Sequence, residues 1–83
     1  MPYQELFRKG TRVRIVSAGA LADFRANWKL HNPLTAEQLR FGGHSATIAS
    51  VGFYHGGDVL YELAGVPGIW HEVCLQAASV NDV

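Results

Sequence analysis

The residues of this chain that could do chemistry are its histidines and its single cysteine. His71 and Cys74 stand three positions apart, and His44 and His55 lie upstream of them. Zinc sites use imidazole and thiolate ligands, usually four of them at short paired spacings, and here at most one pair is present. We therefore expect no metal site and no bound cofactor, and we expect Cys74 to be a small buried hydrophobe.

The same pair has the composition of a thiol nucleophile with its base. In an extended segment a spacing of three places two side chains on opposite faces, although a turn at Val73 would cancel that separation. A metal- or thiol-dependent enzyme centred on His71 and Cys74 therefore stays open as an alternative. No catalytic residue is predicted, and the leading expectation is that the chain is not an enzyme.

Aromatic residues beside two glycine turns carry the strongest binding signal. Loops held on a rigid sheet are where binding residues concentrate, and Tyr and Trp often dominate the energy of an interface. If the two turns lie at the ends of neighbouring strands, their aromatic and histidine residues come together. The predicted partner-binding residues are Tyr54, His55, Trp70 and His71. The competing interpretation is that Trp70 is core and that the histidines are solvated.

The charge balance argues against nucleic acid as the main partner. Seven basic and seven acidic side chains cancel, and the sequence pI is about 6.9. Nucleic-acid-binding proteins usually carry a basic excess that releases counterions from phosphates, and this chain has none. A modest basic strip keeps a nucleic-acid-binding barrel as the second hypothesis, and it consists of Arg8, Lys9, Arg12 and Arg14.

Length and composition predict one domain spanning residues 1–83. One cysteine excludes an intrachain disulfide. Residues 1–10 hold no apolar run of signal-peptide length, and no stretch approaches the roughly 20 apolar residues of a membrane span. We therefore expect a cytoplasmic protein without a membrane partner. Residues 1–8 are expected to form an N-terminal arm and residues 79–83 a frayed tail.

A helical insert is predicted over residues 18–41, directly after a first strand at residues 11–16. Ser17 can cap a helix over residues 18–30, in which Leu21, Phe24 and Trp28 form one apolar stripe. Thr35 and Gln38 then have the spacing of a capping box for a second short helix. Gly42 and Gly43 are expected to end it in the left-handed conformation.

Strand patterns follow the insert. The expected strands are residues 45–54, 59–63, 69–72 and 75–78, with a bulge near Gly52 and a single tight turn at residues 73–74. Glycine turns separate them at residues 55–58 and 65–68. The fold class is therefore mainly β with an α insert, and five short strands favour a small closed barrel with two short helices between strands one and two.

The order of these elements resembles the Src-homology-3-like barrels. The segment at residues 9–15, Lys-Gly-Thr-Arg-Val-Arg-Ile, resembles their first strand, residues 43–48 resemble their second, and residues 69–75 resemble their last strand, short turn and final strand. Among these barrels the chain resembles the electron-transport accessory superfamily, which includes the variable chain of ferredoxin–thioredoxin reductase and the C-terminal domain of the nitrile hydratase β subunit. In those proteins the barrel supports a partner that holds the redox or metal centre, so the resemblance transfers no catalytic residue.

These observations together favour a small non-catalytic protein-interaction or accessory module. The expected partner is another protein, bound at the loops that carry Tyr54 and His71. A two-fold homodimer is also expected, because an open small sheet leaves strand edges and no net charge keeps the copies apart.

Overall fold

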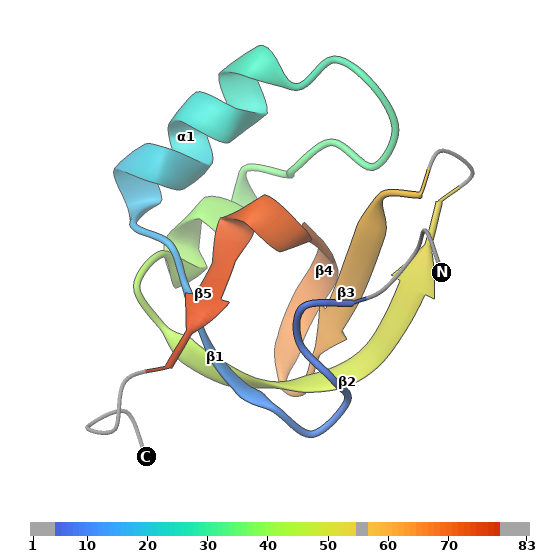
Figure 1. The fold of residues 1–83 in the computed structure, drawn as a ribbon. Helices are drawn as coiled ribbons and strands as arrows, with labels where there is room; N and C mark the ends of the chain where they lie inside the picture. Colours follow the sequence, from blue (N-terminus) through green and yellow to red (C-terminus); the bar gives the residue numbers. More distant parts are fainter. Residues whose placement is uncertain (1–4, 55–56, 79–83) are drawn as a thin grey trace.

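The structure is a computed structural model that describes residues 5–54 and 57–78. Within these residues the chain forms five strands, one α-helix and two short 3₁₀ helices. In chain order they are β1 (Arg12–Ile15), α1 (Ala18–Asn27), η1 (Glu37–Phe41), β2 (Ser45–Phe53), β3 (Val59–Leu63), β4 (Val66–His71), η2 (Glu72–Cys74) and β5 (Leu75–Ala77). The predicted mainly β class with an insert between the first two strands is confirmed (Figure 1).

All strand pairs are antiparallel, and the strand order is β4-β3-β2-β1-β5. The long strand β2 pairs with β1 through its first residues and with β3 from Ile48 onward, so it bends across the fold (Figure 1). Among the described residues β4 and β5 are edge strands that do not pair, so the sheet is open and the expected barrel closure is not found. β5 is only three residues long. The residues directly before it, Glu72–Cys74, form η2 and are therefore not part of a strand.

The core is made by alternate side chains of the strands, which point to the inner face of the sheet. Val13 and Ile15 are fully buried on one face of β1, as predicted, whereas Arg12 lies on the exposed face. Trp70 is opposite Tyr61 across β3 and β4, and both side chains are buried on the inner face of the sheet. Residues one position away from this pair therefore point to the outer face. This alternation decides which side chains can reach a partner.

Helix α1 packs its apolar side against the sheet. Ser17 caps it as predicted by accepting a hydrogen bond from the amide of Ala20. Leu21 is fully buried in the core, and Phe24 packs against that core in a half-buried position. The helix ends at Asn27, three residues before the predicted end, because Trp28 takes an extended conformation and its indole N–H donates to the carbonyl of His31.

The second predicted helix is the 3₁₀ helix η1. The capping box forms, with the amide of Thr35 donating to Gln38 Oε1 and the amide of Gln38 donating to Thr35 Oγ1. Gln38 is buried, and its Nε2 also donates to the carbonyl of Ile69 in the edge strand β4. Gly68 allows this approach, since a Cβ there would lie 2.6 Å from Gln38 Nε2. The Gln38 bond occupies a backbone carbonyl of the edge strand β4, and Pro67 has no backbone N–H to donate. Both features limit strand pairing at the β4 edge, and the predicted homodimer depends on such pairing.

The two glycines after η1 have different roles, which corrects the expectation that both are left-handed. Gly43 has a φ of 81°, whereas Gly42 has a φ of −55°. A Cβ at Gly42 would lie 2.4 Å from the backbone nitrogen of Ala18. Gly42 is therefore required because the end of the insert passes against the start of α1, and Gly43 because the backbone reverses there.

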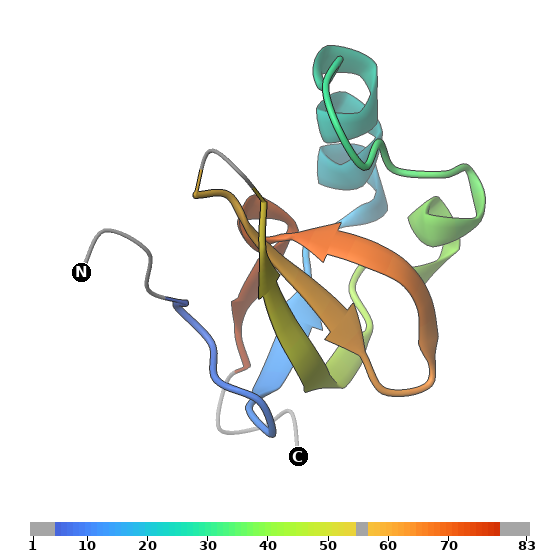
Figure 2. The same ribbon diagram turned by 90° about the vertical axis from the view of Figure 1, so that its right-hand side faces the viewer.

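The N-terminal arm is packed against the sheet from Phe7 onward. Phe7 is buried in the core with its ring centroid 5.9 Å from that of Tyr61. The amides of Leu6 and Phe7 both donate to the Tyr61 hydroxyl. Figure 2 places this arm and the insert on different sides of β3 and β4.

Several predicted boundaries shift by a few residues. β3 matches its predicted range, but β4 begins at Val66 because the turn is only two residues long, at Ala64 and Gly65. The register shift in β2 lies between Ile48 and Ser50 and not at Gly52. The predicted turn at residues 55–58 lies partly outside the described residues, and the predicted tail at residues 79–83 lies wholly outside them. No helix in the described ranges is long and apolar enough to cross a membrane.

Candidate functional site

The structure separates the predicted binding residues into buried and exposed positions. Trp70 is fully buried, with its indole N–H donating to the carbonyl of Pro67, and it therefore has no surface for a partner. Tyr54 follows β2 and is 41% exposed. His71 ends β4 on the outer face, opposite Leu60. His55 lies outside the described residues.

His71 is covered by the insert. Its Nε2–H donates to the carbonyl of Asn32 at 2.8 Å, which ties the segment after α1 to the sheet. Its ring centroid lies 4.9 Å from that of Phe24 and 4.8 Å from that of Trp28. Burial lowers the pKa of His71 below its usual value of 6.5, with a smaller effect of His31 in the same direction, so the ring is neutral at pH 7.

His31 joins Tyr54 to this cluster, and the sequence analysis did not single it out. Its ring stacks on Tyr54 with centroids 3.6 Å apart and nearly parallel planes, and it lies 5.6 Å from the ring of His71. Its Nε2 is 3.1 Å from Asp58 Oδ2, but the atoms are not aligned as a hydrogen bond, so among the described residues this buried nitrogen has no hydrogen-bond partner. The insert thus brings Tyr54 and His71 into one cluster through His31.

A hollow of about 190 Å³ opens beside this cluster, which we call the aromatic hollow. It lies between the C-terminal half of α1, the start of β3 and η2. The rings and carboxylates that line it belong to Phe24, Trp28, His71, Asp58 and Glu72, with Val73 at its edge. A lining that combines rings and carboxylates suits an amphipathic cationic group.

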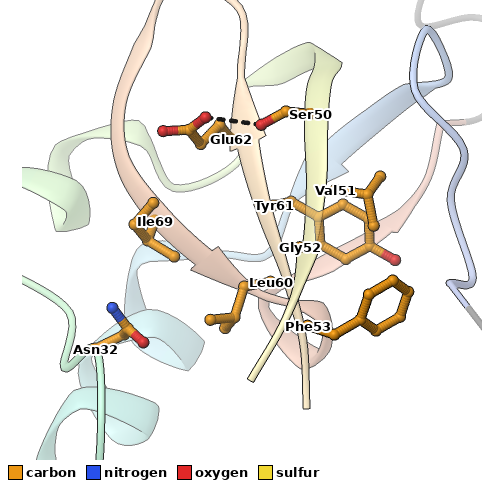
Figure 3. A pocket seen from close by; sticks show the side chains of 9 residues that line it. All are labelled: Asn32, Ser50, Val51, Gly52, Phe53, Leu60, Tyr61, Glu62 and Ile69. Atoms are coloured by element: carbon orange, nitrogen blue, oxygen red, sulfur yellow. Dashed lines mark hydrogen bonds between the residues drawn. The ribbon is translucent and has the colours of Figure 1, made fainter. Parts of the chain in front are cut away.

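A second hollow of about 290 Å³, the sheet hollow, lies over the outer face of β2, β3 and β4. In Figure 3 the side chains of Leu60, Ile69 and Asn32 lie on one side of β3, whereas those of Tyr61, Val51 and Phe53 lie on the other. The hydroxyl of Ser50 donates to Glu62 at its rim (Figure 3). Asn32 has a φ of 49°, a conformation that few residues other than glycine adopt.

The charges near both hollows are acidic. Asp58 and Glu72 line the aromatic hollow and Glu62 lines the sheet hollow, whereas no lysine or arginine of the described residues lines either. Glu72 Oε2 accepts hydrogen bonds from the Tyr61 hydroxyl and the Leu6 amide. Burial and the bond to Glu72 raise the pKa of Tyr61 to about 12, so this hydroxyl stays a donor at neutral pH. A carboxylate has about four acceptor sites, so Glu72 retains capacity for a ligand.

Cys74 and His71 do not form an activated thiol pair. Cys74 is buried in the core, as predicted, and burial raises the pKa of its thiol to about 11. Reactive cysteines have a lowered pKa and some exposure. In the part of the chain that the structure describes, no three of the side chains of His, Cys, Asp and Glu gather as a metal site.

The predicted basic strip lies away from both hollows. Arg12 projects from the exposed face of β1 and donates to Thr47 of the neighbouring strand. Arg14 lies on the same face and Arg8 and Lys9 precede the strand, but neither hollow includes them. The acidic hollows and the basic strip therefore occupy separate parts of the surface. Comparison with known proteins found no matching family model, no matching curated protein and no matching solved structure.

Proposed function

We propose that this chain is a small protein-interaction module, without chemistry of its own, that binds an extended segment of a partner protein. The observation that carries the proposal is the aromatic hollow. There the insert holds Phe24 and Trp28 against His71 and leaves an open, ring-lined space beside Asp58 and Glu72. Aromatic residues held on a rigid sheet are a common way to bind an extended peptide.

We also propose that the sheet is an open member of the Src-homology-3-like barrels. Two features support this: the five antiparallel strands in the order β4-β3-β2-β1-β5, and the one-turn η2 between the last two strands. A shared fold does not transfer a function, so the binding proposal depends on the hollow and not on this resemblance.

The charges favour a basic segment as the partner. A lysine or arginine side chain can lay its apolar stem along Phe24 and Trp28 and place its charge beside Asp58. The neutral ring of His71 does not repel such a charge at pH 7.

A random heptapeptide library panned against the purified protein tests the proposal. Enriched peptides should contain lysine or arginine and should bind the Asp58→Asn variant about tenfold more weakly, which is the loss expected for one charge-assisted hydrogen bond. The control is Glu37→Gln, since this exposed η1 carboxylate lines neither hollow. The proposal is wrong if no peptide is enriched, or if enriched peptides bind equally to the parent and to Asp58→Asn.

A further inference from the structure

The two hollows meet along one boundary. His71 lines the aromatic hollow and Asn32 lines the sheet hollow, and these residues are joined by the 2.8 Å hydrogen bond. Leu60, which lines the sheet hollow, is directly opposite His71 on the neighbouring strand. Opposite residues in an antiparallel pair have Cβ atoms about 5 Å apart. The Asn32–His71 contact therefore separates the two hollows, and a segment that binds both must pass over it.

The sheet hollow differs in chemistry from the aromatic one. Leu60 and Ile69 give it an apolar lining on the side of β3 where Asn32 also lies (Figure 3). The side-chain amide of Asn32 at its rim offers both a donor and an acceptor. An apolar side chain with its neighbouring peptide group matches this combination, because the side chain covers the apolar lining while the amide pairs with the backbone.

We propose that the protein recognises a two-point motif, in which a basic residue occupies the aromatic hollow and an apolar residue two positions away occupies the sheet hollow. The inference rests on the proposed function. In an extended chain, residues two positions apart project to the same side about 6.5 Å apart, and a step of this size would carry the bound segment over the Asn32–His71 contact. The three carboxylates Asp58, Glu62 and Glu72 favour a segment without acidic residues.

The left-handed conformation of Asn32 is consistent with this role. Asparagine is one of the few non-glycine residues that tolerate a positive φ, and here the surrounding structure fixes that conformation. Here the backbone carbonyl of Asn32 is fixed by His71, and the side chain lines the sheet hollow. Glycine at this position would keep the backbone and the carbonyl and would remove only the amide. Asn32→Gly therefore tests the side chain without unfolding the insert.

Three synthetic peptides test the motif by NMR titration at low salt. The first is Gly-Ser-Lys-Ser-Leu-Ser-Gly, the second has the same composition with lysine and leucine exchanged, and the third has serine in place of leucine. One of the first two should bind about tenfold more tightly than the third, because burying a leucine side chain stabilises a complex to about that extent. Both orders of lysine and leucine are tested because the segment can enter the two hollows in either chain direction.

Variants of the protein then show which residues produce the tighter binding of the leucine peptide. In Leu60→Ala and Asn32→Gly the advantage of the leucine peptide should fall below about threefold, while binding of the serine peptide stays unchanged. Leu30→Ala, an exposed leucine that lines neither hollow, should keep the full advantage. The inference is overturned, and the proposed function kept, if the serine peptide binds as tightly as both leucine peptides. If none of the three peptides binds at millimolar concentration, both fail.

Discussion

Replacing Leu21 by alanine tests whether the insert is part of the core. Leu21 is the one α1 side chain that is fully buried. The substitution removes three carbon atoms, at about 0.8 kcal/mol of transfer free energy each, and leaves a cavity that adds to the loss. We expect the free energy of unfolding to fall by about 2.5 to 5 kcal/mol.

This loss is large for a chain of 83 residues. A domain of this length is stable by about 4 to 12 kcal/mol, and each kcal/mol shifts the melting temperature by about 4 to 8 °C. Thermal unfolding followed by circular dichroism should show the Leu21→Ala transition at least about 10 °C below the parent. The control is the same substitution at Leu30, which is 68% exposed in the same insert. Leu30→Ala should stay within about 0.5 kcal/mol of the parent.

Equal melting temperatures for Leu21→Ala and the parent would refute this reasoning. They would mean that α1 adds nothing to the stability of the sheet. The aromatic hollow would then lack a rigid wall, since Phe24 lies in α1 and Trp28 directly follows it.

Three further perturbations have defined outcomes. Gly42→Ala should destabilise the protein far more than Gly43→Ala. A Cβ at Gly42 meets the Ala18 backbone, whereas an alanine at Gly43 has open space and is strained only by the positive φ. Comparable melting temperatures for the two variants would contradict this. Burial lowers the pKa of His71 in the folded state, so the neutral ring stabilises the folded protein above about pH 6.5. This contribution to stability is lost as the pH falls through the folded-state pKa. His71→Gln should therefore flatten the fall in melting temperature between about pH 7 and pH 5. The buried Cys74 thiol, with its pKa raised to about 11, should react with a thiol reagent at pH 8 only at the rate of unfolding, and fast labelling of the native protein would contradict its place in the core.

Local signals in the sequence predicted the insert well. The Ser17 cap and the Thr35–Gln38 capping box depend on residues three positions apart, so they are readable without the fold. The second role of Gln38, its bond to Ile69, could not be predicted because the two residues lie 31 positions apart. Closure of the barrel, which is not found among the described residues, could not be judged from the sequence for a similar reason, since no local pattern says whether two edge strands meet.

The candidate site was predicted in part. Trp70 was predicted as a partner-binding residue beside a turn at residues 65–68, with a core position as the competing interpretation. With the turn at Ala64 and Gly65, β4 begins at Val66, and the register puts Trp70 opposite Tyr61 on the inner face. His31 was missed because it lies in an irregular segment, where only the tertiary contact with Tyr54 gives it a role.

The indole signals of the two tryptophans test the binding face most directly. Trp28 lines the aromatic hollow and its Nε1–H donates to His31, whereas Trp70 lies in the core and its Nε1–H donates to Pro67. An NMR titration with Gly-Ser-Lys-Ser-Leu-Ser-Gly and its exchanged form, with signals assigned through Trp28→Phe, reports both sites at once. The proposed function predicts that the Trp28 indole signal shifts progressively with peptide while the Trp70 signal stays in place. A stationary Trp28 signal at saturating peptide, or a shift confined to Trp70, would contradict it.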